Sequence, residues 1–195
     1  MLTNATCANI LRPSKKASAF LYDIGLIVGG ALFIAVSARL KILLPFSPVP
    51  VTGQTFAVLM VGGLSGAWRG SLSVLLYIIM GMAGLGVFAL GGGFSILLGP
   101  TGGYLVGFIA AAYITGLLAE RGWDRRIATT ILAMVFGNMA VYVFGLLRLC
   151  CLIGVSSTVL TVGLFPFIVG DLLKIALAAS IVFSFGFLAP GLQKR

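Results

Sequence analysis

The chain has 195 residues, of which 60% are hydrophobic and only 9% are charged, and its mean hydropathy is +1.17. A soluble domain normally carries about 25% charged residues, so the composition excludes a soluble globular protein and indicates an all-α integral membrane protein. The net charge of +9 lies at the ends of apolar runs and is not interleaved with aromatic residues, so no nucleic-acid partner is expected.

Six apolar segments are predicted to cross the membrane as helices, since a span needs about 20 apolar residues. Residues 1–16 form a basic leader, and residues 17–195 form one six-helix membrane domain. The predicted spans are residues 17–42, 55–64, 70–83, 103–118, 127–147 and 165–188, with a turn over 65–69 and a polar connector over 154–163. The second and third spans are short for a full crossing, which tilting or flanking residues would have to complete.

Basic residues divide unequally between the two sides of this predicted topology. The side that holds both termini carries nine of them, and the other side carries three. Because Lys and Arg hold loops in the cytoplasm, both termini are expected to be cytoplasmic, in a multi-pass protein of the plasma membrane. The nine are Arg12, Lys15, Lys16, Arg69, Arg121, Arg125, Arg126, Lys194 and Arg195, and the three are Arg39, Lys41 and Arg148.

The stretch from Leu85 to Tyr104 has too many glycines for a stable helix and too many apolar residues for an ordinary surface loop. Non-helical backbone persists in a membrane protein where it packs inside protein or lines a watery cavity. We therefore expect a glycine-rich extracellular loop that forms the wall of a binding site. No charged residue occurs between Gly70 and Ala119, so Gly91–Gly93 lacks the Lys that a phosphate-binding loop needs.

Asp171 and Lys174 lie three residues apart, on one face of the last predicted span, and Asp171 is about 9 Å into that span. Ionisable residues at such a depth are costly and usually mark a functional site. A carboxylate accepts from N–H groups and an ammonium donates to a carbonyl, so the pair suits a neutral urea or amide group. The alternative is a structural ion pair that holds two helices together.

Further side chains are expected to converge on the same outward-facing site, because small-molecule sites combine a few polar groups with many apolar ones. For each aromatic residue taken singly, ordinary packing in the core or against lipid is the favoured explanation, and the set carries more weight than any one member. The candidates are the polar residues Thr52, Gln54, Ser95, Thr101 and Tyr104, the aromatic residues Tyr77 and Phe88, and Gly91 and Gly92, where the backbone could approach a ligand closely.

The chain has three cysteines, four carboxylates and no His. Without His, Cys7, Cys150 and Cys151 cannot form a Cys/His zinc site, and we expect neither a metal nor a cofactor. The same shortage of acid–base groups argues against an enzyme, such as a lipid-modifying transferase.

Five segments carry a joint pattern: Pro48-Val-Pro-Val-Thr-Gly-Gln-Thr55, Leu75-Leu-Tyr77 with Gly81, Gly84-Leu-Gly-Val-Phe-Ala89, Leu98-Gly-Pro-Thr-Gly-Gly-Tyr104 with Gly107-Phe108, and Asp171-Leu-Leu-Lys174. Together they resemble the BioY family, the biotin-specific S components of energy-coupling factor (ECF) transporters. The resemblance covers roughly residues 18 to 190. It departs from the family at Gly86, where the family commonly has Pro.

The resemblance implies a six-helix subunit that captures biotin with high affinity on the outer side of the membrane. ATP-driven uptake would then require a transmembrane coupling (T) subunit and cytoplasmic ATPase subunits. Ala31 and Ala35 resemble the Ala-x-x-x-Ala seam by which S components dock on the coupling subunit. The alternatives are a stand-alone secondary transporter for biotin or another small solute, and an S component for a different vitamin.

Biotin has a ureido ring with two N–H groups and one carbonyl, an apolar body and a carboxylate. The resemblance implies that Asp171 accepts from the ureido N–H groups and that Lys174 donates to the ureido oxygen. The ligand's carboxylate would be met by backbone N–H groups of the glycine-rich loop, or by Thr52 or Gln54. Which end of the ligand Lys174 contacts stays open at this point.

Overall fold

The computed structural model describes residues 6–192 and is mostly helical; side chains are described as far as Gly186. Lys194, Arg195 and residues 1–5 of the predicted leader lie outside the described residues. The helices are α1 (Cys7–Ile10), α2 (Lys16–Ser37), α3 (Gln54–Ser65), α4 (Ala67–Met82), α5 (Phe94–Leu98), α6 (Gly102–Glu120), the 3-10 turn η1 (Trp123–Arg125), α7 (Ile127–Ile153), α8 (Ser157–Gly163) and α9 (Phe165–Leu192).

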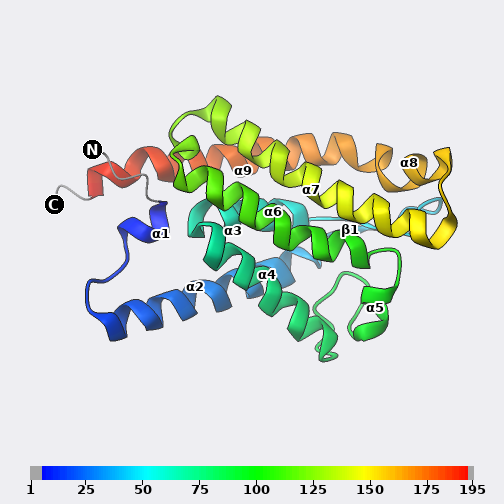
Figure 1. The fold of residues 1–195 in the computed structure, drawn as a ribbon, viewed down its shortest axis with the longest axis horizontal. Coiled ribbons are helices and arrows are strands. Elements are labelled where there is room, and N and C mark those ends of the chain that lie inside the picture. The colour runs from blue at the N-terminus through cyan, green and yellow to red at the C-terminus, as the bar shows by residue number, and fades with distance from the viewer. Residues whose placement is uncertain (1–5, 193–195) are drawn as a thin grey trace.

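The long helices lie along one direction and form an elongated bundle (Figure 1). Two short antiparallel strands, β1 (Lys41–Ile42) and β2 (Val51–Thr52), join α2 to α3. In Figure 1, α1, η1 and the last turns of α9 lie at one end of the bundle, and α5 and α8 lie at the other. We call the end with α1 and η1 the η1 end. We call the end with α5 and α8 the β1 end, because the strands β1 and β2 lie on that side.

Within residues 6–192, four segments are long and apolar enough to span a membrane: Lys16–Ser37, Gly102–Glu120, Ile127–Ile153 and Ser157–Gly186. The two remaining predicted spans correspond to α3, with 12 residues, and α4, with 16 residues. At a rise of 1.5 Å per residue these helices are about 18 and 24 Å long, shorter than the hydrocarbon core of about 30 Å. The structure thus gives four candidate spans and two short apolar helices, and six crossings stay a prediction.

The turn between α3 and α4 is tighter than the sequence predicted. Gly66 alone separates the two helices, with φ of +90°, a value that side-chain-bearing residues rarely adopt. The N–H of Ala67 then donates to Oε1 of Glu120 at 3.0 Å, which gives a free N–H at the start of α4 a partner. The predicted turn over residues 65–69 is therefore wrong at its second half, where Arg69 already belongs to α4.

The predicted connector over residues 154–163 is also mostly helical. α7 continues past the predicted end at residue 147, so Arg148 and both adjacent cysteines belong to it. After a break at Gly154, the hydroxyl of Ser156 accepts from the N–H of Thr158 at 3.1 Å and caps α8. The Ser and Thr residues that suggested a loop thus start a helix, as such residues do at N-caps.

α6 is the central helix, packed against α3, α4 and α7. Small residues permit this closeness: a methyl group at Gly116 would lie 2.4 Å from the nitrogen of Ala67, and one at Gly62 would lie 2.6 Å from the oxygen of Ala112. Because backbone lies directly opposite each glycine, the three-helix core α3–α4–α6 has no space for a larger residue there.

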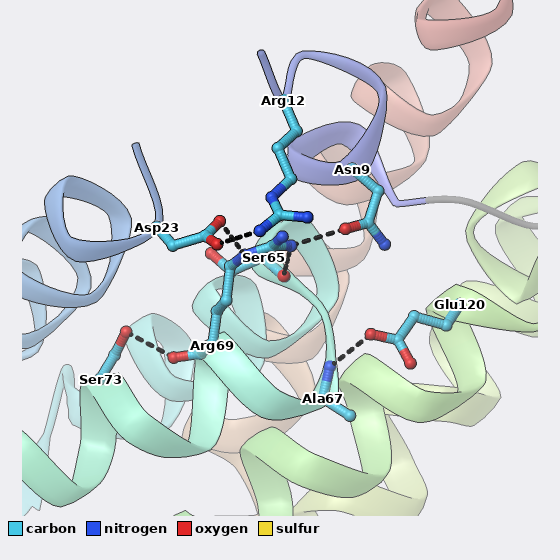
Figure 2. Close-up of polar contacts among 8 residues, drawn as sticks. All are labelled: Asn9, Arg12, Asp23, Ser65, Ala67, Arg69, Ser73 and Glu120. Carbon is cyan, nitrogen blue, oxygen red and sulfur yellow. Dashed lines mark hydrogen bonds and ion pairs between the residues drawn. The ribbon is translucent and has the colours of Figure 1, made fainter. Parts of the chain in front are cut away.

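A polar network closes the η1 end (Figure 2). Asp23 of α2 accepts from Arg12 Nη2 and from Arg69 Nε, each at 2.7 Å. Arg69 Nη1 also donates to Asn9 Oδ1 at 2.6 Å, which ties the segment around α1 to α2 and α4. Arg12 and Arg69, two of the nine basic residues that the sequence assigned to one side, therefore lie together at one end of the bundle. Which side of the membrane this end faces stays a prediction.

Candidate functional site

A cavity near the β1 end is enclosed by β2, α3, α6, α7, α9 and the segment of residues 83–101, which we call the glycine loop. It holds about 50 Å³, less than two clefts of about 320 and 500 Å³ nearer the η1 end, but it contains the Asp171–Lys174 pair. Its lining is mostly apolar with a few polar side chains. The lining residues are Val49, Pro50, Thr52, Gln54, Thr55, Phe88, Ala89, Leu90, Ile96, Thr101, Tyr104, Leu105, Phe108, Val141, Tyr142, Phe167, Asp171 and Lys174.

Asp171 lies on α9 with only 4% of its surface exposed, and its two oxygens face different helices. Oδ1 accepts from Lys174 Nζ at 2.9 Å and from Thr55 Oγ1 at 3.3 Å. Oδ2 accepts from Asn138 Nδ2 at 3.0 Å and from Tyr142 Oη at 2.5 Å. An ionised carboxylate has about four acceptor positions, so this carboxylate is fully satisfied although it is buried.

Lys174 completes the pair on the cavity side. Its Nζ donates to Asp171 Oδ1 and also to Thr55 Oγ1, at 3.2 Å, so the hydroxyl of Thr55 sits between the two charges. The acceptor Asp171 Oδ1 and the donor Lys174 Nζ therefore stand side by side at the cavity wall, 2.9 Å apart. This adjacency is what the three-residue spacing on a helix predicted.

Five other predicted site residues share the cavity with this pair, and they come from distant parts of the chain. β2 and the start of α3 supply two, the glycine loop supplies two, and α6 supplies one. Tyr104 is held in place by its hydroxyl, which donates to the carbonyl of Gly163 at 2.7 Å. These residues are Thr52, Gln54, Phe88, Thr101 and Tyr104.

Tyr77 does not line the cavity but supports two residues that do. Its hydroxyl accepts from Gln54 Nε2 at 2.6 Å and donates to the carbonyl of Val87 at 3.3 Å. Its ring meets that of Phe88 edge to face, with centroids 5.5 Å apart. Tyr77 is completely buried, so its place is behind the cavity wall, where it orients Gln54 and Phe88.

The other three predicted loop residues also lie outside the cavity lining. Gly91 pairs with Phe88 through two backbone hydrogen bonds of 2.9 and 3.1 Å, and this tight turn directs Phe88 inward. A methyl group at Gly92 would lie 2.5 Å from the nitrogen of Gly86, so the close approach at Gly92 is to the protein's own backbone. Ser95 is exposed on α5, a helical turn within a stretch that the sequence predicted to be non-helical.

Three residues that contact Asp171 were not predicted from the sequence: Asn138 and Tyr142 of α7, and Thr55 of α3. Asn138 and Tyr142 are four residues apart, so they lie on one face of a helix. Two polar residues on one face of an apolar span are a signal that the sequence does contain. It does not reveal that this face meets Asp171, because that depends on the packing of α7 against α9.

Ala31 and Ala35, the expected docking residues, lie in the core of the bundle, 0% and 9% exposed. In this conformation their side chains face the protein's own helices. Their role in docking to a partner stays a prediction.

The sequence matches the BioY family over residues 11–189. It is 38% identical over 161 residues to the biotin transporter BioY of Rhizobium etli, covering 76% of this chain and 86% of that protein. It is 39% identical over 149 residues to the biotin transporter BioY of Thermotoga maritima, with coverage of 76% and 86%. The structure resembles the crystal structure of the S-component for biotin from an ECF-type ABC transporter, with a TM-score of 0.78, 25% identity, and coverage of 93% of this chain and 96% of that one. The chain therefore belongs to the BioY family.

Proposed function

We propose that this protein is the biotin-binding S component of an ECF-type transporter, a membrane subunit and not an enzyme. Its relatives are named biotin transporters, and the solved structure that it resembles is a biotin S-component. Asp171 and Lys174 of the cavity are the residues on which biotin recognition depends in this proposal.

The observation that carries the proposal is the side-by-side acceptor and donor at the cavity wall. In a cyclic urea each N–H lies beside the carbonyl, so one edge of the ring presents a donor next to an acceptor. Asp171 Oδ1 and Lys174 Nζ, 2.9 Å apart, present the complementary acceptor and donor. Asp171 Oδ2 is already occupied by α7, so Asp171 accepts one ureido N–H and not two.

Binding requires this cavity to widen. Sites for small molecules usually have volumes of about 300 to 1,000 Å³, whereas this cavity holds about 50 Å³. The hydroxyl of Thr55 is the group for the ligand to displace, because its bond to Asp171 Oδ1 is the longest of the four at 3.3 Å. A ureido N–H in its place keeps the carboxylate fully satisfied.

The energising partners belong to the same proposal. The chain has no Gly-Lys-Ser/Thr sequence for ATP, so uptake depends on a membrane-embedded coupling subunit and cytoplasmic ATPase subunits. We place the β1 end with the glycine loop on the outer side and the η1 end in the cytoplasm. Six crossings, with α3 and α4 tilted or extended by flanking residues, complete this topology.

The test is binding of labelled biotin to the purified protein in detergent. Asp171→Asn and Lys174→Ala should each weaken binding at least about tenfold, or about 1.4 kcal/mol. Asp23→Asn and Lys16→Ala make matched charge changes at the η1 end and should leave binding unchanged. If folded wild-type protein does not bind biotin, biotin is refuted as the ligand. If both site variants retain binding, Asp171 and Lys174 form only a structural ion pair. Uptake by vesicles that lack any ATPase would favour a stand-alone transporter.

A further inference from the structure

Besides Lys174, three basic residues lie near the β1 end, and each donates to backbone carbonyls of the glycine loop. Arg39 Nη2 donates to the carbonyl of Gly86 at 2.8 Å, and Lys41 Nζ donates to that of Ala89 at 2.5 Å. Arg148 donates to the carbonyls of Leu98 and Gly99. These cations come from the end of α2, from β1 and from α7, so the loop is held from three directions.

These cations have no carboxylate among their partners in the described structure. The whole chain has only four Asp and Glu residues. Asp23 pairs with arginines at the η1 end, Glu120 accepts from the N–H of Ala67, Asp124 lies in η1, and Asp171 pairs with Lys174. The β1 end therefore carries positive charge that a ligand anion can balance.

Of these three cations, Lys41 is the one whose hydrogen-bond partner lines the cavity, and the β1–β2 ribbon places it there. Lys41 lies directly opposite Thr52 in the antiparallel register, so both side chains project from the same face of the ribbon. Thr52 lines the cavity, and so does Ala89, whose carbonyl accepts from Lys41 Nζ. The ammonium is thus placed at the rim of the cavity, between β1 and the glycine loop.

A short path through the structure connects this rim to Asp171. Thr55 contacts both Asp171 and Lys174, and Thr52 precedes it by three residues, a chain segment of at most about 10 Å. Lys41 lies one strand further, about 5 Å away across the ladder. Lys41 is therefore within reach of the other end of an elongated ligand whose ureido group binds Asp171.

We propose that Lys41, with Arg39 beside it, binds the carboxylate of the ligand. The inference deepens the proposed function and rests on it. It differs from the expectation that loop N–H groups, Thr52 or Gln54 serve the carboxylate, because it assigns that end to a cation. An ammonium has three donors, and the described structure gives Lys41 one partner, so a carboxylate can bind while the bond to Ala89 persists. The bound ligand would then join β1 to the glycine loop.

The experiment compares biotin with biotin methyl ester, which keeps the ureido ring and lacks the negative charge. Dissociation constants are measured for the wild type, Lys41→Gln, Lys41→Arg, Lys174→Ala and Arg148→Gln. Wild-type protein should bind the ester at least tenfold more weakly than biotin. Lys41→Gln should weaken biotin binding at least fivefold and change ester binding less than twofold, and Lys41→Arg should restore the preference for biotin.

The two other variants separate charge recognition from loop anchoring. Lys174→Ala should weaken both compounds equally, because its partner is the ureido group. Arg148→Gln removes a cation that contacts only loop carbonyls outside the cavity lining, so any effect should also be equal for both compounds.

Two results overturn the inference while leaving the proposed function intact: equal affinity of the wild type for biotin and its ester, or equal weakening of both compounds by Lys41→Gln. The second would make Lys41 only an anchor for the glycine loop. If well-folded wild-type protein binds neither compound, the proposed function fails and this inference fails with it. A melting curve for each variant verifies that it is folded.

Discussion

The two oxygens of Asp171 have different tasks. Lys174 is on the same helix as Asp171 and faces the cavity, whereas Tyr142 and Asn138 of α7 hold the oxygen that points away from Lys174. A carboxylate with one oxygen anchored cannot rotate freely, so its other oxygen faces the cavity in a defined direction. Such preorganisation lowers the entropy that binding has to overcome.

At this scale we predict that Tyr142→Phe weakens biotin binding about tenfold, since a hydrogen bond to a charged group contributes roughly 1.5 to 3 kcal/mol. The change removes only the hydroxyl that donates to Asp171 Oδ2. Tyr113→Phe is the matched control, because Tyr113 is 47% exposed and lies outside the cavity lining. Equilibrium binding of labelled biotin to both variants is the measurement. An unchanged affinity of Tyr142→Phe would show that Asn138 alone anchors the carboxylate.

At the scale of the helices, glycines decide how closely the bundle packs. Gly116 of α6 faces the backbone where α4 begins, with no room for a methyl group. Gly25 and Gly29 of α2, by contrast, have no atom within 4 Å of where a methyl group would be. The sequence shows glycines in both helices, but only the packing distinguishes a glycine that faces another backbone from one that faces open space.

We predict opposite effects of one substitution at these two kinds of site. Gly116→Ala should lower the stability by about 1 to 3 kcal/mol, because the added carbon would lie 2.4 Å from the nitrogen of Ala67 and the helices must separate. Gly29→Ala should be neutral or stabilising by up to about 1 kcal/mol, since Ala favours a helix. Apparent melting temperatures in detergent provide the comparison, and equal shifts in the two variants would contradict this account of the packing.

At the scale of the whole molecule, the β1 end and the η1 end carry different features. The cavity and the glycine loop lie toward the β1 end, while the network of Asp23, Arg12 and Arg69 closes the η1 end. α7, with 27 residues and a length of about 40 Å, separates the turn at Arg121 from the turn at Val155. In the proposed topology α7 crosses the membrane, so we expect these two turns on opposite sides of it.

We predict that Val155→Cys reacts with a membrane-impermeant thiol reagent from outside the cell, and that Arg121→Cys reacts only in inside-out vesicles. Both side chains are exposed, Val155 to 93%. The background would carry Ala at Cys7, Cys150 and Cys151, since these are free thiols. The reverse labelling pattern would show that the β1 end faces the cytoplasm. Labelling of both positions from the same side would show that α7 does not cross the membrane.

The sequence by itself determined the membrane class, the approximate positions of the long helices and the Asp171–Lys174 pair. These features depend on local properties: apolar runs of sufficient length, and a three-residue spacing that places two side chains on one helical face. The resemblance to BioY likewise rested on short linked segments, and the match over residues 11–189 confirmed that family. Helix ends were less well predicted, because Ser156 can begin a helix or belong to a loop.

Only the tertiary structure decided which residues surround that pair. Tyr142 and Asn138 join the site because α7 packs against α9, and Lys41 reaches the cavity rim because β1 pairs with β2 in one register. Gly91 and Gly92 lie outside the lining because the glycine loop folds on its own backbone, and Tyr77 lies outside it because it packs behind Gln54 and Phe88. Ser95 lies outside the lining on the exposed helix α5. Each of these outcomes depends on contacts between residues far apart in the sequence, which no local pattern of residue types encodes.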